Sequence, residues 1–174
     1  MDWRGFELHP ETPPGGQPLA ARFGAARAAA MKEYLQRFAD AFGVRGLQVP
    51  DRTPNTRRAL ALAEWARARG RVAPFRDAVM RAHWAANEDI EDEAVLARCA
   101  AAAGLDAGEA RAALSDPAWT ACVDAMAEEA RREGVTGIPT FVAGEARVVG
   151  CQPYPEIAAA AEQAGARRRL AAGG

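Results

Sequence analysis

A proline at position 139 stands where the hydrophobic pattern of the chain changes from helical to strand-like. Before it, Trp119, Val123 and Met126 recur at helical spacing and Gly134 provides a stop signal; after it, the period becomes two. A proline that opens a strand donates no hydrogen bond to the ladder, and an X–Pro bond prefers trans by only about 0.5–1 kcal/mol. A fold can therefore hold this corner as a cis proline beside an open sheet edge.

This corner, within the stretch GVTGIPTF, predicts a surface that holds a substrate. The backbone of Thr136, Gly137 and Ile138 can pair with an extended peptide by strand addition, while Pro139 packs against a reactive sulfur opposite it. The alternative is an ordinary trans proline at the start of a strand, and for an isolated G-I-P-T this alternative is favoured. The elements around the corner argue for the substrate-holding surface.

The segment from about residue 19 to 133 is rich in Ala, Leu and Arg and predicts five or six helices. One of them is opened by Asp106 with Glu109 three residues on, the spacing of a capping box. Start and stop signals place the helices over 25–42, from 55 to 70, over 74–86, from 89 to 104, from 106 for a short stretch, and from 116 to 134.

Strands are predicted near both ends of the chain. The aromatic segment WRGFEL, residues 3–8, precedes a run of breakers and predicts a short strand followed by a loop. Residues 140–142 and 147–149 predict two antiparallel strands joined by a tight loop. A final helix is expected over 153–165, followed by a frayed tail.

Length and composition predict one domain over residues 1–174, since 174 residues with 49% hydrophobic content suffice for one core. The 22 basic and 23 acidic residues balance, which argues against nucleic acid or an anionic membrane as a partner. No apolar run has the length of a signal peptide or a membrane span, so a cytoplasmic location is expected. Three widely spaced cysteines fit reduced thiols, and no Cys-x-x-Cys pair occurs.

The order of long helix, glycine cap, V-T-G-I-P-T-F-V, tight loop, V-V-G and terminal helix resembles the second half of a DsbA-family thioredoxin domain. WRGFELHPETPPGG and VVGCQPYPEI resemble the FrnE-like cytoplasmic branch, and the helices of 19–133 resemble its helical insertion with flanking helices. The resemblance implies an α/β thioredoxin-like fold and thiol-disulfide oxidoreductase activity. The resemblance also implies protein or peptide thiols and disulfides as partners of the chain, and it is compatible with a homodimer.

The chain departs from the family pattern at the nucleophile. The family places a Cys-x-x-Cys, or a serine in its glutathione-using relatives, directly after the first strand. In the sheet of the family, that first strand would lie between WRGFEL and the strand after Pro139. No residue here matches that position, so no catalytic residue is assigned, and a first βα unit is absent from the pattern. An upstream start, a strand donated by another chain, or direct pairing of WRGFEL with the hairpin could fill the gap; the first is favoured because it leaves no central strand unpaired.

Among the thiols, Cys151 precedes a predicted helix start, where the helix dipole favours a thiolate. In the glutathione-using relatives the corresponding junction binds the tripeptide, so the resemblance makes Cys151 and Gln152 candidate ligand contacts; a small buried side chain is the favoured alternative. Cys99 and Cys122 lie on apolar helical stripes and predict core positions. Neither histidine has a partner at metal-ligand spacing, so no metal site is expected.

The sequence leaves three functions open. A thiol-disulfide oxidoreductase of the DsbA family, without a cofactor, is favoured. The second is a glutathione-dependent isomerase or transferase, similar to 2-hydroxychromene-2-carboxylate isomerase or kappa-class glutathione transferase. The third is a non-catalytic module that binds peptides.

Overall fold

The computed structural model describes residues 2–167, so most of the tail that is expected to fray lies outside the described residues. The chain forms two compact units: unit 1 extends to Ala127, and unit 2 begins at Glu128. The prediction of a single domain over 1–174 is not tested by this division and stays a prediction. Within residues 2–167, no helix is both long enough and apolar enough to cross a membrane.

Unit 1 is helical. Its elements are β1 (Gln17–Pro18), α1 (Leu19–Phe23), α2 (Ala25–Ala41), β2 (Arg52–Thr53), α3 (Arg57–Ala68), α4 (Val72–Trp84), α5 (Glu93–Ala102), α6 (Ala107–Leu114) and the first part of α7 (Pro117–Arg132). Helices α2 to α7 match the six predicted helices closely. Helix α1 and the antiparallel pair β1–β2 were not predicted from the sequence, because elements of five and two residues are too short to show a hydrophobic period.

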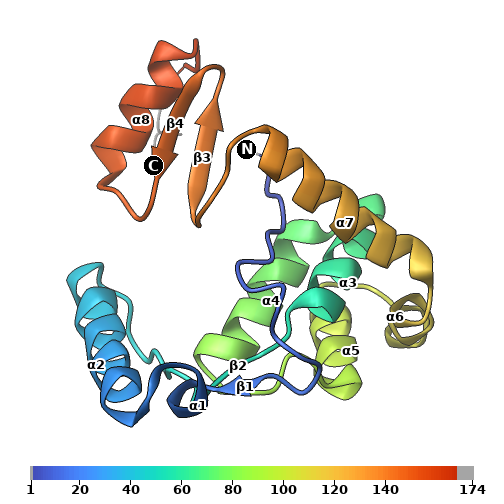
Figure 1. Ribbon diagram of the computed structural model, residues 1–174. Coiled ribbons are helices and arrows are strands. Elements are labelled where there is room, and N and C mark those ends of the chain that lie inside the picture. The colour runs from blue at the N-terminus through green and yellow to red at the C-terminus, as the bar shows by residue number, and fades with distance from the viewer. Residues whose placement is uncertain (1, 168–174) are drawn as a thin grey trace, which may run out of the picture. The chain divides into compact units, whose positions relative to one another are not determined.

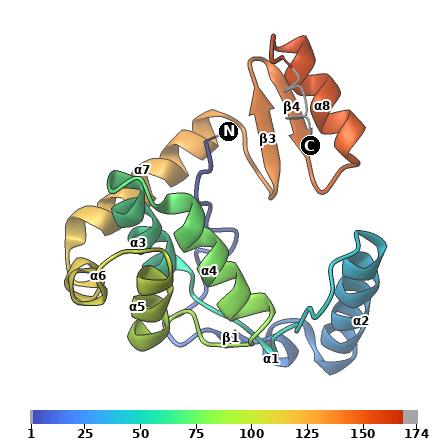
Figure 2. The same ribbon diagram turned by 180° about the vertical axis from the view of Figure 1, so that it is seen from behind.

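The core of unit 1 lies among helices α3 to α6, which Figures 1 and 2 show side by side. Its largest fully buried side chains are Trp65, Phe75, Leu62 and Leu96. Several alanines are fully buried between them, including Ala66, Ala100 and Ala110. Small side chains let helix axes approach closely, so the alanine richness of the sequence serves the packing of these helices. A smaller cluster joins Val123 and Met126 of α7 to Ala61 of α3.

Helix α6 begins at the cap that the sequence predicts. The Asp106 carboxylate accepts a hydrogen bond from the Glu109 N–H at 2.8 Å. Replacing Asp106 with alanine is expected to lower the free energy of unfolding by about 1 kcal/mol, because an N–H of the first turn loses its acceptor. Urea unfolding followed by tryptophan fluorescence measures this. Asp106→Asn should stay close to wild type, since asparagine caps equally well; an equal loss in both variants would contradict the capping role.

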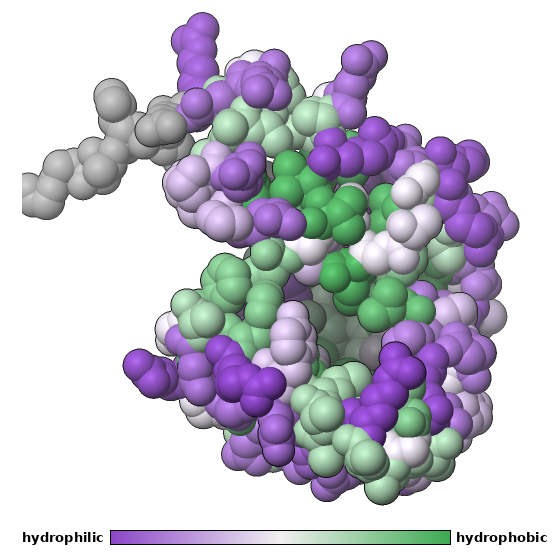
Figure 3. Space-filling model, turned by 60° about the vertical axis from the view of Figure 1, so that its left-hand side comes forward, coloured by the Kyte–Doolittle hydropathy of each residue, from purple (hydrophilic) through white to green (hydrophobic). Residues whose placement is uncertain are grey.

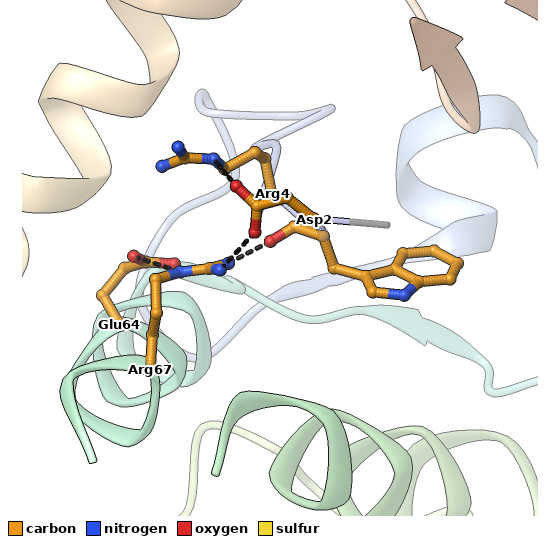
Figure 4. Close-up of polar contacts among 5 residues, drawn as sticks. Asp2, Arg4, Glu64 and Arg67 are labelled. Carbon is orange, nitrogen blue, oxygen red and sulfur yellow. Dashed lines mark hydrogen bonds and ion pairs between the residues drawn. The ribbon is translucent and has the colours of Figure 1, made fainter. Parts of the chain in front are cut away.

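The prediction of a strand over residues 3–8 is wrong: the segment has no regular secondary structure. A strand requires a neighbour to complete its ladder, and no described residue gives the backbone of residues 4–8 a hydrogen bond. Side chains of unit 1 hold the segment instead. Figure 4 shows Arg67 of α3 between Asp2 and Glu64, at 2.6 Å and 2.8 Å, and Arg67 also donates to the Trp3 carbonyl.

Further along the same segment, the Arg57 guanidinium binds the Glu7 carboxylate at 2.8 Å and also contacts Asp124 of α7. Gly5 passes so close to α3 that a Cβ there would lie 2.7 Å from Leu60 Cδ2. The segment is therefore fixed by side-chain contacts with α3 and α7 rather than by a ladder.

Unit 2 contains the end of α7, a hairpin of β3 (Thr140–Ala143) and β4 (Ala146–Val149), and α8 (Tyr154–Gln163). The strands pair antiparallel, with Phe141 opposite Val148 and Ala143 opposite Ala146. Gly144, at φ +59°, provides the left-handed backbone that the two-residue loop requires. The predicted hairpin and terminal helix are both present, within two residues of their expected ends.

Candidate functional site

The predicted substrate-binding residues form the corner that leads from α7 into β3. After α7, the Val135 N–H closes the helix end on the Ala130 carbonyl at 2.9 Å. The Ile138–Pro139 peptide bond is cis, and the Ile138 side chain is 52% exposed. The Thr140 hydroxyl donates to the Gly137 carbonyl at 2.7 Å, which ties the corner to the first residue of β3.

The hydrogen bonds of the hairpin determine which backbone groups of β3 remain open. The Gly150 N–H donates to the Pro139 carbonyl at 2.8 Å, so residue 139 faces β4. Because alternate residues of an antiparallel strand face the same neighbour, Thr140 and Val142 direct their N–H and C=O groups to the opposite edge. Among the described residues no strand other than β4 pairs with β3, so this edge is unpaired.

The two faces of the hairpin differ in exposure. Phe141 and Val148 are half-buried on the face that α8 covers. Val142 and Val149, on the other face, are 49% and 55% exposed. Arg147 shares that face, and its charge is paired with Glu133 at 2.6 Å. The unpaired edge of β3 is thus flanked by a largely apolar face, and the one cation within the hairpin, Arg147, is paired with a carboxylate.

The second pair of predicted contacts lies just beyond β4. Gln152 donates from its side-chain amide to the Val149 carbonyl at 3.0 Å, which closes the turn before α8. Cys151 is exposed, so the alternative of a small buried side chain is wrong. The sequence could not show this, because a glycine directly before a thiol and a proline two residues after it give no burial pattern. Whether Cys151 and Gln152 contact a ligand stays a prediction.

The other two thiols occupy helices of unit 1. Cys99 is buried in the helical core, where burial raises the pKa of its thiol. Cys122 is half-buried on α7, less enclosed than the core position predicted for it. A thiol with a raised pKa is a poor nucleophile at neutral pH, so Cys99 has the character of a core residue.

Both histidines contact neighbouring side chains of unit 1. His9 contacts the Arg22 guanidinium at 2.9 Å. His83 lies against Trp84 with ring centroids 4.6 Å apart, and burial lowers the pKa of its imidazole. Residues 2–167 contain no cluster of three or more His, Cys, Asp or Glu side chains suited to a metal ion.

A cluster of polar contacts around Glu91 in unit 1 was not predicted from the sequence. The Glu91 carboxylate accepts hydrogen bonds from the backbone N–H groups of Gly15 and Asn55, at 2.7 Å and 2.8 Å. The Asn55 side chain donates in turn to the carbonyl of buried Thr12 at 2.7 Å. These contacts join three loops beside a cavity of about 200 Å³. Glu91 lies in the acidic stretch 88–93 before α5, and acidic residues are typical of a helix start, so only the fold reveals its partners.

Comparisons with known proteins agree with the fold described above. The model of the DSBA-like thioredoxin domain matches residues 1–162. The crystal structure of a probable DsbA oxidoreductase from Streptomyces coelicolor is similar, with a TM-score of 0.83 and 35% identity; 96% of this chain and 76% of that chain are covered. A 2-hydroxychromene-2-carboxylate isomerase is similar at a TM-score of 0.65 and 26% identity, covering 72% of this chain and 61% of the isomerase. No curated protein matches the chain.

These matches confirm two predictions from the sequence: the resemblance to DsbA proteins, and an α/β thioredoxin-like fold with a large helical insertion. Seven helices, α1 to α7, occupy the segment predicted as the insertion and its flanking helices. The chain therefore belongs to the family of DSBA-like thioredoxin domains.

Proposed function

We propose that this chain functions in thiol-disulfide exchange on peptides, as an oxidoreductase of the DsbA type. The observation that carries the proposal is the unpaired edge of β3, which begins at the corner formed by Thr136, Gly137, Ile138 and Pro139. Membership of the family and the similarity to a probable DsbA oxidoreductase support it. The proposed partners are protein or peptide thiols and disulfides, in the cytoplasm.

In this function the edge of β3 holds the substrate by strand addition. In the 174-residue chain this edge is the position at which the family pattern places its first strand. An extended peptide added there exchanges main-chain hydrogen bonds with Thr140 and Val142, which fixes its register beside the corner. The exposed side chains of Val142 on β3 and of Ile138 at the corner favour apolar residues in that peptide. The chemical step is attack of a thiolate on the substrate disulfide, and no residue of this sequence is assigned as that thiolate.

Removing one N–H from the edge tests the binding mode. The variant Val142→Pro loses a donor that faces away from β4, and an edge strand tolerates proline at such a position. Binding of fluorescein-labelled insulin B chain, measured by fluorescence anisotropy, should weaken about two- to tenfold, the worth of one hydrogen bond.

The matched control is Val142→Thr, which retains the N–H and the β-branched shape. It should bind the peptide like the wild type. Equal affinity in Val142→Pro and Val142→Thr would show that the peptide does not pair with this edge. Circular dichroism of both variants checks that the hairpin and α8 remain folded.

The similarity to 2-hydroxychromene-2-carboxylate isomerase supports a second candidate, a glutathione-dependent isomerase or transferase. Under this function Cys151 and Gln152 contact glutathione. An insulin-reduction assay and a calorimetric titration with glutathione, both on the 174-residue chain, separate the possibilities. Faster insulin reduction supports the oxidoreductase, and glutathione binding without it supports the isomerase. Peptide binding alone would indicate a non-catalytic module and contradict the proposal of exchange activity.

The exposure of the thiols gives a further expected result. Iodoacetamide should modify Cys151 in the native protein before Cys122 and Cys99, because only Cys151 is exposed. Mass spectrometry of tryptic peptides over a time course measures the order. Slower modification of Cys151 in the presence of glutathione would support the ligand contact, and an unchanged rate would argue against it.

A further inference from the structure

Arg147 of β4 makes two contacts with one residue at the end of α7. Its Nε donates to the Glu133 carbonyl at 3.0 Å, and its Nη2 donates to the Glu133 carboxylate at 2.6 Å. Both residues belong to unit 2. A planar guanidinium that serves two acceptors on one residue is held in one orientation, because the second bond costs little further freedom. We call this pair of contacts the Arg147 clasp.

The clasp lies at a helix end, where a donor and a positive charge are both favourable. α7 ends at Arg132, and the carbonyl groups at a helix C-terminus have no partner within the helix. The helix dipole gives this end a partial negative charge. Arg131 and Arg132 belong to the last turn, but both are exposed. Arg147 therefore supplies from the hairpin a donor for the carbonyl that directly follows the helix.

The clasp also fixes one of the two ends of the corner. The corner, residues 134–139, joins the end of α7 to the start of β3. At its far end, the Gly150 N–H donates to the Pro139 carbonyl at 2.8 Å. Arg147 pairs with Val142 in the hairpin, so the clasp ties the start of the corner to the same two strands that hold its end.

Within the corner, two glycines leave the backbone little restricted by its neighbours. A Cβ at Gly134 or at Gly137 would meet no atom within 4 Å. Glycine has more conformational freedom to lose than any other residue. The Thr140 hydroxyl gives one internal contact, to the Gly137 carbonyl at 2.7 Å. The order of the corner therefore depends on the contacts at its two ends, and the clasp is one of them.

Arg147 lies among apolar side chains at the surface of the hairpin. Val142 and Val149 share its face and are 49% and 55% exposed. Figure 3 shows hydrophilic and apolar side chains side by side over the face that it displays. The stem of an arginine can pack along apolar side chains while its head group reaches a polar partner. The side chains of the two valines offer no acceptor, so the guanidinium stays on Glu133.

We propose that Arg147 is a positioning residue, whose clasp holds the corner in the conformation that receives a peptide. This inference rests on the proposed function for what the corner holds. In this role Arg147 needs no contact with the peptide, since it acts through Glu133 on residues 134–139. A loop that is ordered before binding loses less freedom when the peptide arrives, so the clasp strengthens binding without adding a contact.

Relaxation of ¹⁵N nuclei in the free 174-residue chain tests the clasp without any peptide. In Arg147→Ala, the backbone order parameters of Thr136 and Gly137 should fall from about 0.85, typical of rigid backbone, to below about 0.6. The order parameter of Phe141, inside the hairpin, should not change. The control Arg132→Ala removes an exposed cation from the same helix end and should behave like the wild type. Unchanged order parameters at Thr136 and Gly137 in Arg147→Ala would overturn the proposal.

Peptide affinity shows whether the order of the corner matters for binding. Arg147→Ala should bind fluorescein-labelled insulin B chain about two- to tenfold more weakly than the wild type and Arg132→Ala, the cost of ordering a loop on binding. Arg147→Lys keeps the charge and a donor, so it should recover part of the affinity. Glu133→Gln keeps the carbonyl contact and should also lie between.

The two measurements separate failure of the clasp from failure of the proposed function. A corner that loosens in Arg147→Ala while the peptide affinity stays at the wild-type value would overturn the positioning role. A wild-type chain that binds no peptide would contradict the proposed function, and the order parameters alone would then decide whether the clasp holds the corner. Circular dichroism checks that each variant keeps its helix content.

Discussion

Replacing Phe75 with alanine is expected to lower the free energy of unfolding of unit 1 by about 3–5 kcal/mol. Phe75 is 1% exposed and lies in the main core cluster with Trp65 and Leu96. Removing the ring loses the transfer free energy of its buried atoms and leaves a cavity that rigid neighbouring helices fill only in part. All four tryptophans precede residue 128, so tryptophan fluorescence during urea unfolding reports on unit 1.

The control for Phe75 is Met80→Ala on the same helix. Met80 is 53% exposed, and its replacement should change the free energy of unfolding by about 0.5 kcal/mol or less. A cost below about 1.5 kcal/mol for Phe75→Ala, well under the usual range for a buried phenylalanine, would mean that this helical core is not the one described.

Replacing Glu91 with alanine should have the second largest effect, a loss of about 2 kcal/mol in the free energy of unfolding. Its carboxylate is the acceptor for the N–H groups of Gly15 and Asn55 in two separate loops. The Asn55 N–H is partly buried, so water replaces the lost acceptor poorly. The loops on both sides of the cavity in unit 1 should loosen together.

Two variants bracket the role of Glu91. Glu91→Gln keeps one acceptor oxygen and should fall between the wild type and Glu91→Ala. Glu93 lies two residues on, and its half-exposed ion pairs with Arg58 and Arg111 are 3.4 Å and 3.7 Å long. Glu93→Ala should cost about 0.5 kcal/mol or less. If Glu91→Ala and Glu93→Ala had equal effects, the backbone hydrogen bonds of Glu91 would not stabilise the fold.

The elements that the sequence predicted well are those whose signals are local. The cap of α6 is an example, because Asp106 and Glu109 are three residues apart and need no other part of the chain. The hairpin is another, since its period of two and its short loop are visible in ten residues. Helix α2 was placed to within one residue at its C-terminal end by Gly43, whose φ is +72°.

The predictions that failed depended on distant partners. Residues 3–8 have the composition of a strand, but a strand forms only beside a neighbour, and Arg57 and Arg67 hold the segment from α3 instead. The pairing of Glu91 with Gly15 spans 76 residues of sequence and leaves no local pattern. The exposure of Cys151 likewise depends on the fold of the turn before α8, which the hydrogen bond from Gln152 to the Val149 carbonyl closes.

Within the candidate site, the corner and the start of β3 could be placed from the sequence because a glycine stop, a proline and a change of period coincide there. The sequence does not show which edge of β3 is open, since that depends on the hydrogen bond from the Gly150 N–H to the Pro139 carbonyl. This one hydrogen bond assigns alternate residues of the strand to β4 or to a partner.

Amide hydrogen exchange resolved by residue, measured by NMR with saturating insulin B chain, tests the central claim most directly. Peptide pairing should slow exchange at Thr140 and Val142, whose N–H groups face the open edge, and leave Phe141 unchanged, since its N–H already faces β4. Exchange that stays unchanged at Thr140 and Val142 while the peptide is bound would contradict the proposal that this edge holds the substrate.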